Sequence, residues 1–122
     1  MIVAGFGFRA AASVDSLREV YGRAIGSRRV DHLATTTDKA SSPAFTAFAA
    51  ALNLPTVAID AKVLTGIETH TQSEASQAAR GTGSLAEAAA LAAAGSNARL
   101  LTARVVSLDR MATCAIAFGD GE

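Results

Sequence analysis

The sequence is poor in cysteine, proline and aromatic residues. Its 122 residues include one cysteine, Cys114, two prolines and no tryptophan, and only 5% are aromatic. A single cysteine excludes an internal disulfide, and chains without disulfides are typical of a reducing compartment. We therefore expect a cytoplasmic protein whose core depends on neither cross-links nor many large rings.

An excess of one charge and long apolar runs are also missing. Eleven Lys and Arg residues balance eleven Asp and Glu residues, and they form no basic run of the kind that marks a nucleic-acid interface. No apolar run reaches the ~20 residues that span a bilayer. The apolar start over residues 1–7 is too short for a signal peptide and indicates a first strand. We expect neither a nucleic-acid partner nor a membrane partner.

Strand and helix patterns alternate along the N-terminal half of the chain. The predicted strands are 2–6, 32–37, 56–59, 99–107 and 111–118, and the main predicted helices are 13–26, 42–53, 71–80 and 84–95. Alternation favours parallel strands with helices on both faces, and the last two runs favour an antiparallel hairpin. The sequence therefore predicts a single domain over residues 1–122 with an α/β fold. We expect three α/β/α layers around a mixed sheet of about five strands.

The segment from Gly81 to Gly95 carries the strongest local signals. Ser84 and Glu87 have the spacing of a capping box, and the body that follows is mostly Ala, the best helix former. Gly95 suits a left-handed residue at the end of the helix. We expect a helix that packs closely on the sheet. Its free N-terminal amides, together with Gly81 and Gly83, suit an anion site, and the alternative is a capped core helix with no ligand.

Four short motifs occur in a fixed order. They are Gly5-Phe6-Gly7, where the first strand runs into a loop, Ala34-Thr35-Thr36-Thr37-Asp38-Lys39 with the later Pro43, Ser73-Glu74, and the segment from Gly81 to Leu91. With these motifs, residues 2–118 resemble the family formed by CobE and the C-terminal domain of CbiG, proteins of cobalamin (vitamin B12) biosynthesis. The resemblance implies a role in that pathway, with a precorrin or related corrinoid as ligand and no further cofactor.

The resemblance leaves three kinds of activity open. The first is binding of a precorrin or other tetrapyrrole intermediate as a carrier or accessory factor. The second is a hydrolase or lyase acting on a (cobalt-)precorrin lactone, because full-length CbiG proteins resemble hydrolases that open such a ring. The third is docking on another cobalamin-biosynthesis enzyme. We favour the carrier or accessory role, because the sequence shows no recognisable catalytic set.

The expected ligand sets the chemistry of the site. Precorrins carry carboxylates on acetate and propionate arms, so a binding cleft needs cations and amide donors at its rim. In open α/β sheets such clefts lie at the carboxyl ends of the strands. Arg9, in a loop after the first strand, and Lys39, in a loop after the second, are expected there beside the turn at 81–84. The predicted ligand-binding residues are Gly5, Gly7, Arg9, Lys39, Gly81, Thr82, Gly83, Ser84 and Glu87.

The remaining reactive side chains have simpler interpretations. Glu87 is a candidate general base, but helix capping accounts for it. His32 and His70 stand alone, without the neighbours that a metal site requires, and no metal site is predicted. Cys114 lies in an apolar strand and should be an inert, buried thiol.

Overall fold

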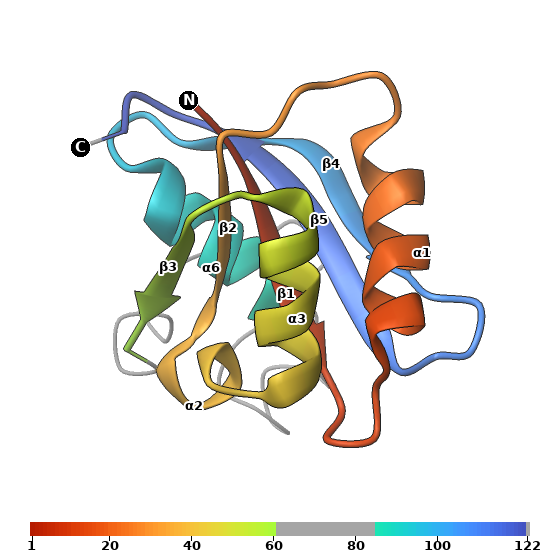
Figure 1. Ribbon diagram of the computed structural model, residues 1–122. Helices are drawn as coiled ribbons and strands as arrows, with labels where there is room; N and C mark the ends of the chain where they lie inside the picture. The colour runs from red at the N-terminus through yellow and green to blue at the C-terminus, as the bar shows by residue number, and fades with distance from the viewer. Residues whose placement is uncertain (61–84, 122) are drawn as a thin grey trace, which may run out of the picture.

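A five-stranded mixed sheet forms the centre of the molecule in the computed structural model, which describes residues 1–60 and 85–121 (Figure 1). The strands are β1 (Ile2–Phe8), β2 (His32–Thr36), β3 (Thr56–Ile59), β4 (Arg99–Val106) and β5 (Ala112–Phe118). The helices are α1 (Val14–Ile25), α2 (Thr37–Ala40), α3 (Pro43–Leu52) and α6 (Leu85–Ala94). The predicted helix at 71–80 lies outside the described residues.

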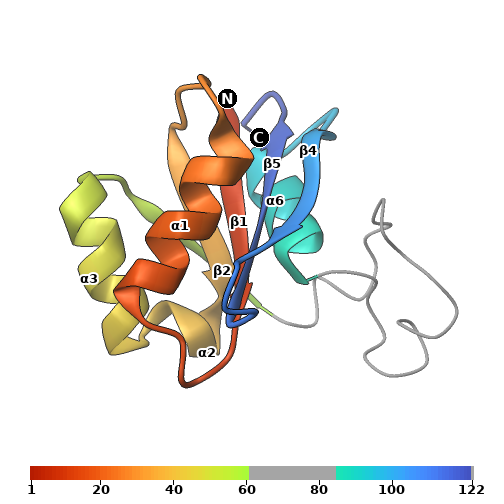
Figure 2. The same cartoon turned by 90° about the vertical axis from the view of Figure 1, so that its right-hand side faces the viewer.

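The order of the strands is β3-β2-β1-β5-β4. β1, β2 and β3 are parallel, whereas β5 runs antiparallel to both β1 and β4. Helices α1 and α3 cover one face and α6 covers the other, so the layers are α/β/α (Figure 2). The predicted mixed sheet, with its parallel N-terminal part and its C-terminal antiparallel hairpin, is confirmed.

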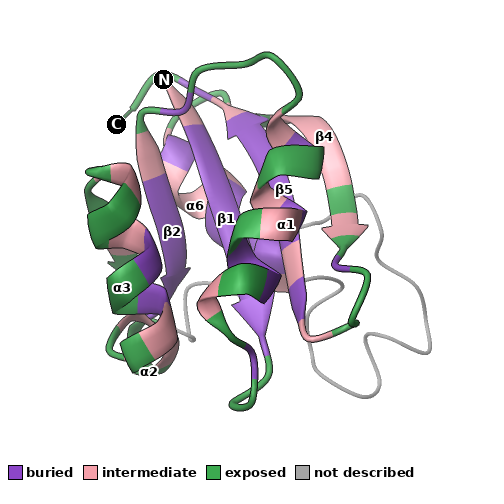
Figure 3. Cartoon of the chain, turned by 45° about the vertical axis from the view of Figure 1, so that its right-hand side comes forward, coloured by how far each residue is buried: buried purple, intermediate pink, exposed green. Residues whose placement is uncertain are grey.

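One face of the sheet holds nearly all of the scarce aromatic residues. Phe6 and Phe8 of β1 point towards α1 and α3, where Tyr21, Phe45 and Phe48 pack against them with ring centroids 5.3–6.2 Å apart. Edge-to-face and stacked rings at such spacings add to the stabilisation that comes from burial. The few rings are therefore concentrated between the sheet and helices α1 and α3, and β1, β2 and β5 lie largely buried behind these helices (Figure 3).

The opposite face is built from small residues. Side chains alternate across a strand, so Val3, Gly5 and Gly7 of β1 face α6. A Cβ atom at Gly5 would lie 2.5 Å from the amide nitrogen of Ala90 and closer still to the carbonyl oxygen of Ala86. The sequence predicts that the first strand ends at Phe6 in a Gly-x-Gly loop, and that boundary is wrong. β1 runs on to Phe8, and Gly5 lets the backbone of α6 approach the strand.

The helix ends follow the capping signals of the sequence. Ser13 caps α1 through a reciprocal pair of hydrogen bonds with Ser16. Pro43 begins α3, and Asn53 ends it in the left-handed conformation, with φ at 56°. Gly95 follows α6 with φ at 87°, as the sequence predicted. No helix among the described residues has both the length and the apolar character needed to cross a membrane.

Candidate functional site

The order of the strands changes direction beside β1, which creates a switch point at the carboxyl end of this strand. β2 and β3 extend the sheet on one side of β1, and β5 and β4 extend it on the other. Such switch points are where open α/β sheets form ligand clefts. Arg9 follows the last residue of β1, and its backbone N–H donates to the carbonyl oxygen of Met111 at 2.9 Å. This bond holds the β1–α1 connection against the turn between β4 and β5.

Lys39 is fixed at the same end of the sheet. Its Nζ donates to the carbonyl oxygen of Phe8 at 2.7 Å and lies 5.2 Å from the centroid of the Phe8 ring. The prediction of a loop around Lys39 is wrong, because Thr37–Ala40 forms the short helix α2 directly after β2. The helical turn directs the side chain back to β1. An ammonium group has three N–H donors, so two remain for other partners.

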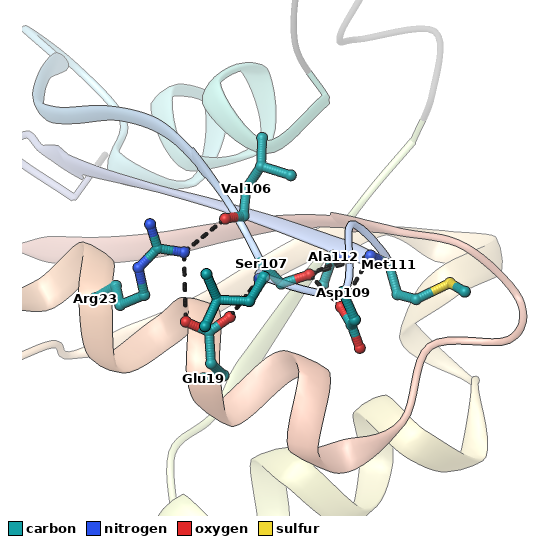
Figure 4. A network of polar contacts seen from close by, with 8 residues as sticks. Glu19, Arg23, Val106, Ser107, Asp109, Met111 and Ala112 are labelled. Atoms are coloured by element: carbon teal, nitrogen blue, oxygen red, sulfur yellow. Dashed lines mark hydrogen bonds and ion pairs between the residues drawn. The ribbon is translucent and has the colours of Figure 1, made fainter.

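Helix α1 anchors the turn between β4 and β5 (Figure 4). Glu19 Oε1 accepts from the backbone N–H of Leu108 at 2.8 Å, and Arg23 Nη1 donates to the carbonyl oxygen of Val106 at 2.7 Å. Arg23 also pairs with Glu19 at 3.3 Å. Two side chains one helical turn apart therefore bind the two backbone groups that lead into the turn.

Asp109 organises the inside of the turn. Its Oδ1 accepts from Ser107 Oγ at 2.6 Å and from the backbone N–H of Met111 at 3.0 Å, and Ser16 of α1 donates to its Oδ2. Hydrogen bonds to a carboxylate favour its charged form. The bonds from Ser107 and then Ser16 accordingly lower the pKa of Asp109 below its ordinary value of 3.8.

Arg110 stands in a costly backbone conformation. Its φ is 62°, in the left-handed region that side chains with a Cβ adopt only at a cost of about 1–2 kcal/mol. Its backbone N–H donates to the carbonyl oxygen of Ser107 at 2.9 Å, which closes the turn. The anchored turn therefore imposes this conformation, and backbone strain of this kind is common at functional sites.

These segments enclose a cleft of about 410 Å³. Four of its described lining residues are basic and none is acidic: the basic ones are Arg9, Lys39, Arg104 and Arg110. None of the four has an ion-pair partner within residues 1–60 and 85–121. The apolar part of the lining comes from Phe8, Leu85, Val106 and Met111. A positive rim over apolar surface suits a ligand that combines carboxylates with a hydrophobic body.

The structure brings some of the predicted site residues together and separates others. Gly7, Arg9 and Lys39 all line the cleft. Gly5 does not, because it lies beneath α6. Glu87 is fully buried, and its Oε2 accepts from the backbone N–H of Arg104 at 2.8 Å. Gly81, Thr82, Gly83 and Ser84 lie outside the described residues, so their predicted roles stay predictions.

Sequence reasoning missed two of the four cations. Arg110 lies in the predicted connection of the hairpin, and a basic residue in such a turn was its only signal. Arg104 lies inside a predicted strand, and no pattern separated it from an ordinary exposed strand residue. Both reach the cleft because β5 pairs with β1 and thereby brings the hairpin turn to the end of β1.

The other described candidate side chains, His32 and Cys114, do not line this cleft. His32 is half-buried at the start of β2, opposite Val3, and so at the other end of the sheet. His70 lies outside the described residues. Cys114 is fully buried, and burial raises the pKa of its thiol well above the ordinary value. Within the described part of the chain, no group of three or more His, Cys, Asp or Glu residues is placed to hold a metal ion.

Comparisons with known proteins agree on one relationship. The family model described as "Cobalamin synthesis G C-terminus" matches residues 2–117. The crystal structure of CobE, a protein from the cobalamin (vitamin B12) biosynthetic pathway, is 31% identical over 96% of this chain and 89% of its own, with a TM-score of 0.82. The cobalamin biosynthesis protein ChiG from Agrobacterium tumefaciens strain C58 is 37% identical over 98% and 99%, with a TM-score of 0.74. No curated protein sequence matches significantly.

Proposed function

Because this chain belongs to the cobalamin synthesis G C-terminal family, we propose that its basic cleft binds a carboxylate-rich precorrin or related tetrapyrrole intermediate of cobalamin biosynthesis. The protein acts as a carrier or accessory factor for that intermediate. The observation that carries the proposal is the set of four basic side chains around one cleft, without acidic partners among the described residues. A cleft lined by one sign of charge attracts ligands of the opposite sign.

The geometry of the cations suits several separate carboxylates. Arg9, Arg104 and Arg110 are exposed, and they come from three different segments of the chain. A guanidinium group binds a carboxylate through two parallel hydrogen bonds, whereas the ammonium group of Lys39 acts as a compact point charge. A ligand whose acidic arms radiate from one ring therefore meets a separate donor for each arm.

The proposal is tested by titrating the protein with uroporphyrin, a stable tetrapyrrole that carries acetate and propionate arms. We expect binding that weakens as salt is added, because the cations lie at an open, solvent-exposed rim. Arg9→Ala and Arg110→Ala should each weaken binding roughly 3–5-fold, the upper part of the range for one exposed ion pair. Isothermal titration calorimetry measures both effects.

A matched control separates local contacts from overall charge. Arg18→Ala removes an exposed arginine of α1 that does not line the cleft, so its affinity should stay within about twofold of the wild type. Equal losses in all three variants, or no binding by the wild type, would contradict the proposal. Mass spectrometry of a precorrin incubated with the protein is a second check. Recovery of the ligand unchanged supports a carrier, whereas an opened lactone ring indicates a hydrolase.

A further inference from the structure

Glu87 is an unusual residue for its position. The α6 sequence contains no other charged residue, and Glu87 has no exposed surface. A carboxylate is expensive to bury unless donors satisfy it. One of these donors is the backbone N–H of Arg104, 2.8 Å from Oε2 and 17 residues further along the chain. Glu87 therefore joins α6 to the middle of β4, which is more than a helix-capping role requires.

The amide of Arg104 is available because β4 is irregular there. Thr102 pairs with Ile116 and Val105 pairs with Cys114, so two residues of β4, Ala103 and Arg104, lie opposite one residue of β5. This is the arrangement of a β-bulge, which interrupts the ladder and redirects a side chain. Val105 packs with the core under α1, so Arg104 points to the α6 face, where it lines the cleft.

We propose that Glu87 is a positioning residue for the cleft: by accepting the bulge amide of Arg104, it fixes the point on β4 from which the Arg104 guanidinium reaches the ligand. This inference rests on the proposed function, because Arg104 must itself contact a carboxylate of the ligand. Glu87 does not touch the ligand and acts only through Arg104. Its effect on binding therefore exists only while the arginine side chain is present.

A double-mutant cycle with uroporphyrin tests this role in the full chain. We expect Arg104→Ala to weaken binding roughly 3–5-fold and Glu87→Ala to weaken it by a similar factor. The double variant should bind no more weakly than Arg104→Ala alone. Glu87→Gln should stay close to the wild type, because the side-chain oxygen of glutamine still accepts from the amide. Hydrogen exchange of the Arg104 amide, followed by NMR, should be slow in the wild type and in Glu87→Gln.

The outcomes distinguish this inference from the proposed function. Two outcomes refute the positioning role alone. The first is that the losses of affinity add in the double variant. The second is that a folded Glu87→Ala protein binds like the wild type while Arg104→Ala does not. No binding by the wild type refutes both. If Glu87→Ala does not fold, hydrogen exchange of the Arg104 amide decides the question. Fast exchange of the Arg104 amide in the wild type refutes the role, and slow exchange that Glu87→Gln retains supports it.

Discussion

Replacing Gly5 by alanine tests how α6 is seated on the sheet. The new Cβ atom would lie 2.5 Å from the backbone nitrogen of Ala90 and 2.8 Å from its Cβ, and closer still to the carbonyl oxygen of Ala86. Ordinary contact begins near 3.4 Å, so the helix must retreat by about 1 Å. A gap of that size forfeits a quarter to a half of the dispersion energy of the atoms concerned. The clash involves backbone atoms of a buried helix, which no rotamer change relieves.

We therefore expect Gly5→Ala to lower the free energy of unfolding by about 3 kcal/mol, the upper part of the range for overpacked cores. In urea unfolding followed by circular dichroism, the midpoint should fall by about 1–3 M, because the unfolding free energy of small domains changes by ~1–3 kcal/mol per molar urea. Gly22→Ala is the matched control. Gly22 is exposed within α1, and an added Cβ meets no atom within 4 Å. This variant should gain about 0.5–1 kcal/mol. A loss below about 1 kcal/mol in Gly5→Ala would refute the close seating of α6.

Three further predictions concern the hairpin. Asp109→Asn should be less stable than the wild type above about pH 4, and this difference should vanish as the pH falls further. The hydrogen-bonded carboxylate has a pKa lowered from 3.8, and its contribution to stability is lost when it is protonated. A difference in unfolding free energy that denaturation shows to be independent of pH would contradict this. Arg110→Gly should be more stable to urea than Arg110→Ala by about 1 kcal/mol, because glycine adopts positive φ freely, while both lose uroporphyrin affinity equally. Cys114 should resist iodoacetamide at about pH 8 until the protein is unfolded, as mass spectrometry of the modified protein would show.

The parts of the fold that sequence reasoning predicted correctly depend on local signals. The Ala-rich run that becomes α6 has high helix propensity, and Pro43 and Asn53 bound α3 by their backbone preferences. The parallel direction of the N-terminal strands followed from the alternation of elements, and the antiparallel hairpin followed from its short connection. These features require no knowledge of distant contacts, so the sequence alone was enough.

The errors arose where a local pattern had two physical causes. A glycine can occur in a turn because it adopts positive φ, or in a strand because the absence of a Cβ atom lets another backbone approach closely. Gly5 and Gly7 belong to the second case, because α6, which is distant from them in the sequence, packs on them. The sequence predicts a loop at Lys39, because a single turn of helix such as α2 has almost no sequence signature. Both corrections required the tertiary structure.

The missed cations show why the cleft could only be half predicted. Arg9 and Lys39 follow strands of the parallel part of the sheet, where the topology alone places residues after β1 and β2 at one edge. Arg104 and Arg110 depend on a bulge and on a left-handed residue, and both features are held by contacts from other elements. Glu87 holds the bulge amide, and α1 holds the turn through Glu19. Backbone carbonyls and the carboxylates of Glu19, Asp109 and Glu87 thus position the hairpin and Lys39, and among the described residues no ion pair involves the four cations of the cleft. The cleft therefore keeps its positive charge, because other groups fix its shape. A fixed, positive cleft is the condition for recognising an acidic ligand with little rearrangement.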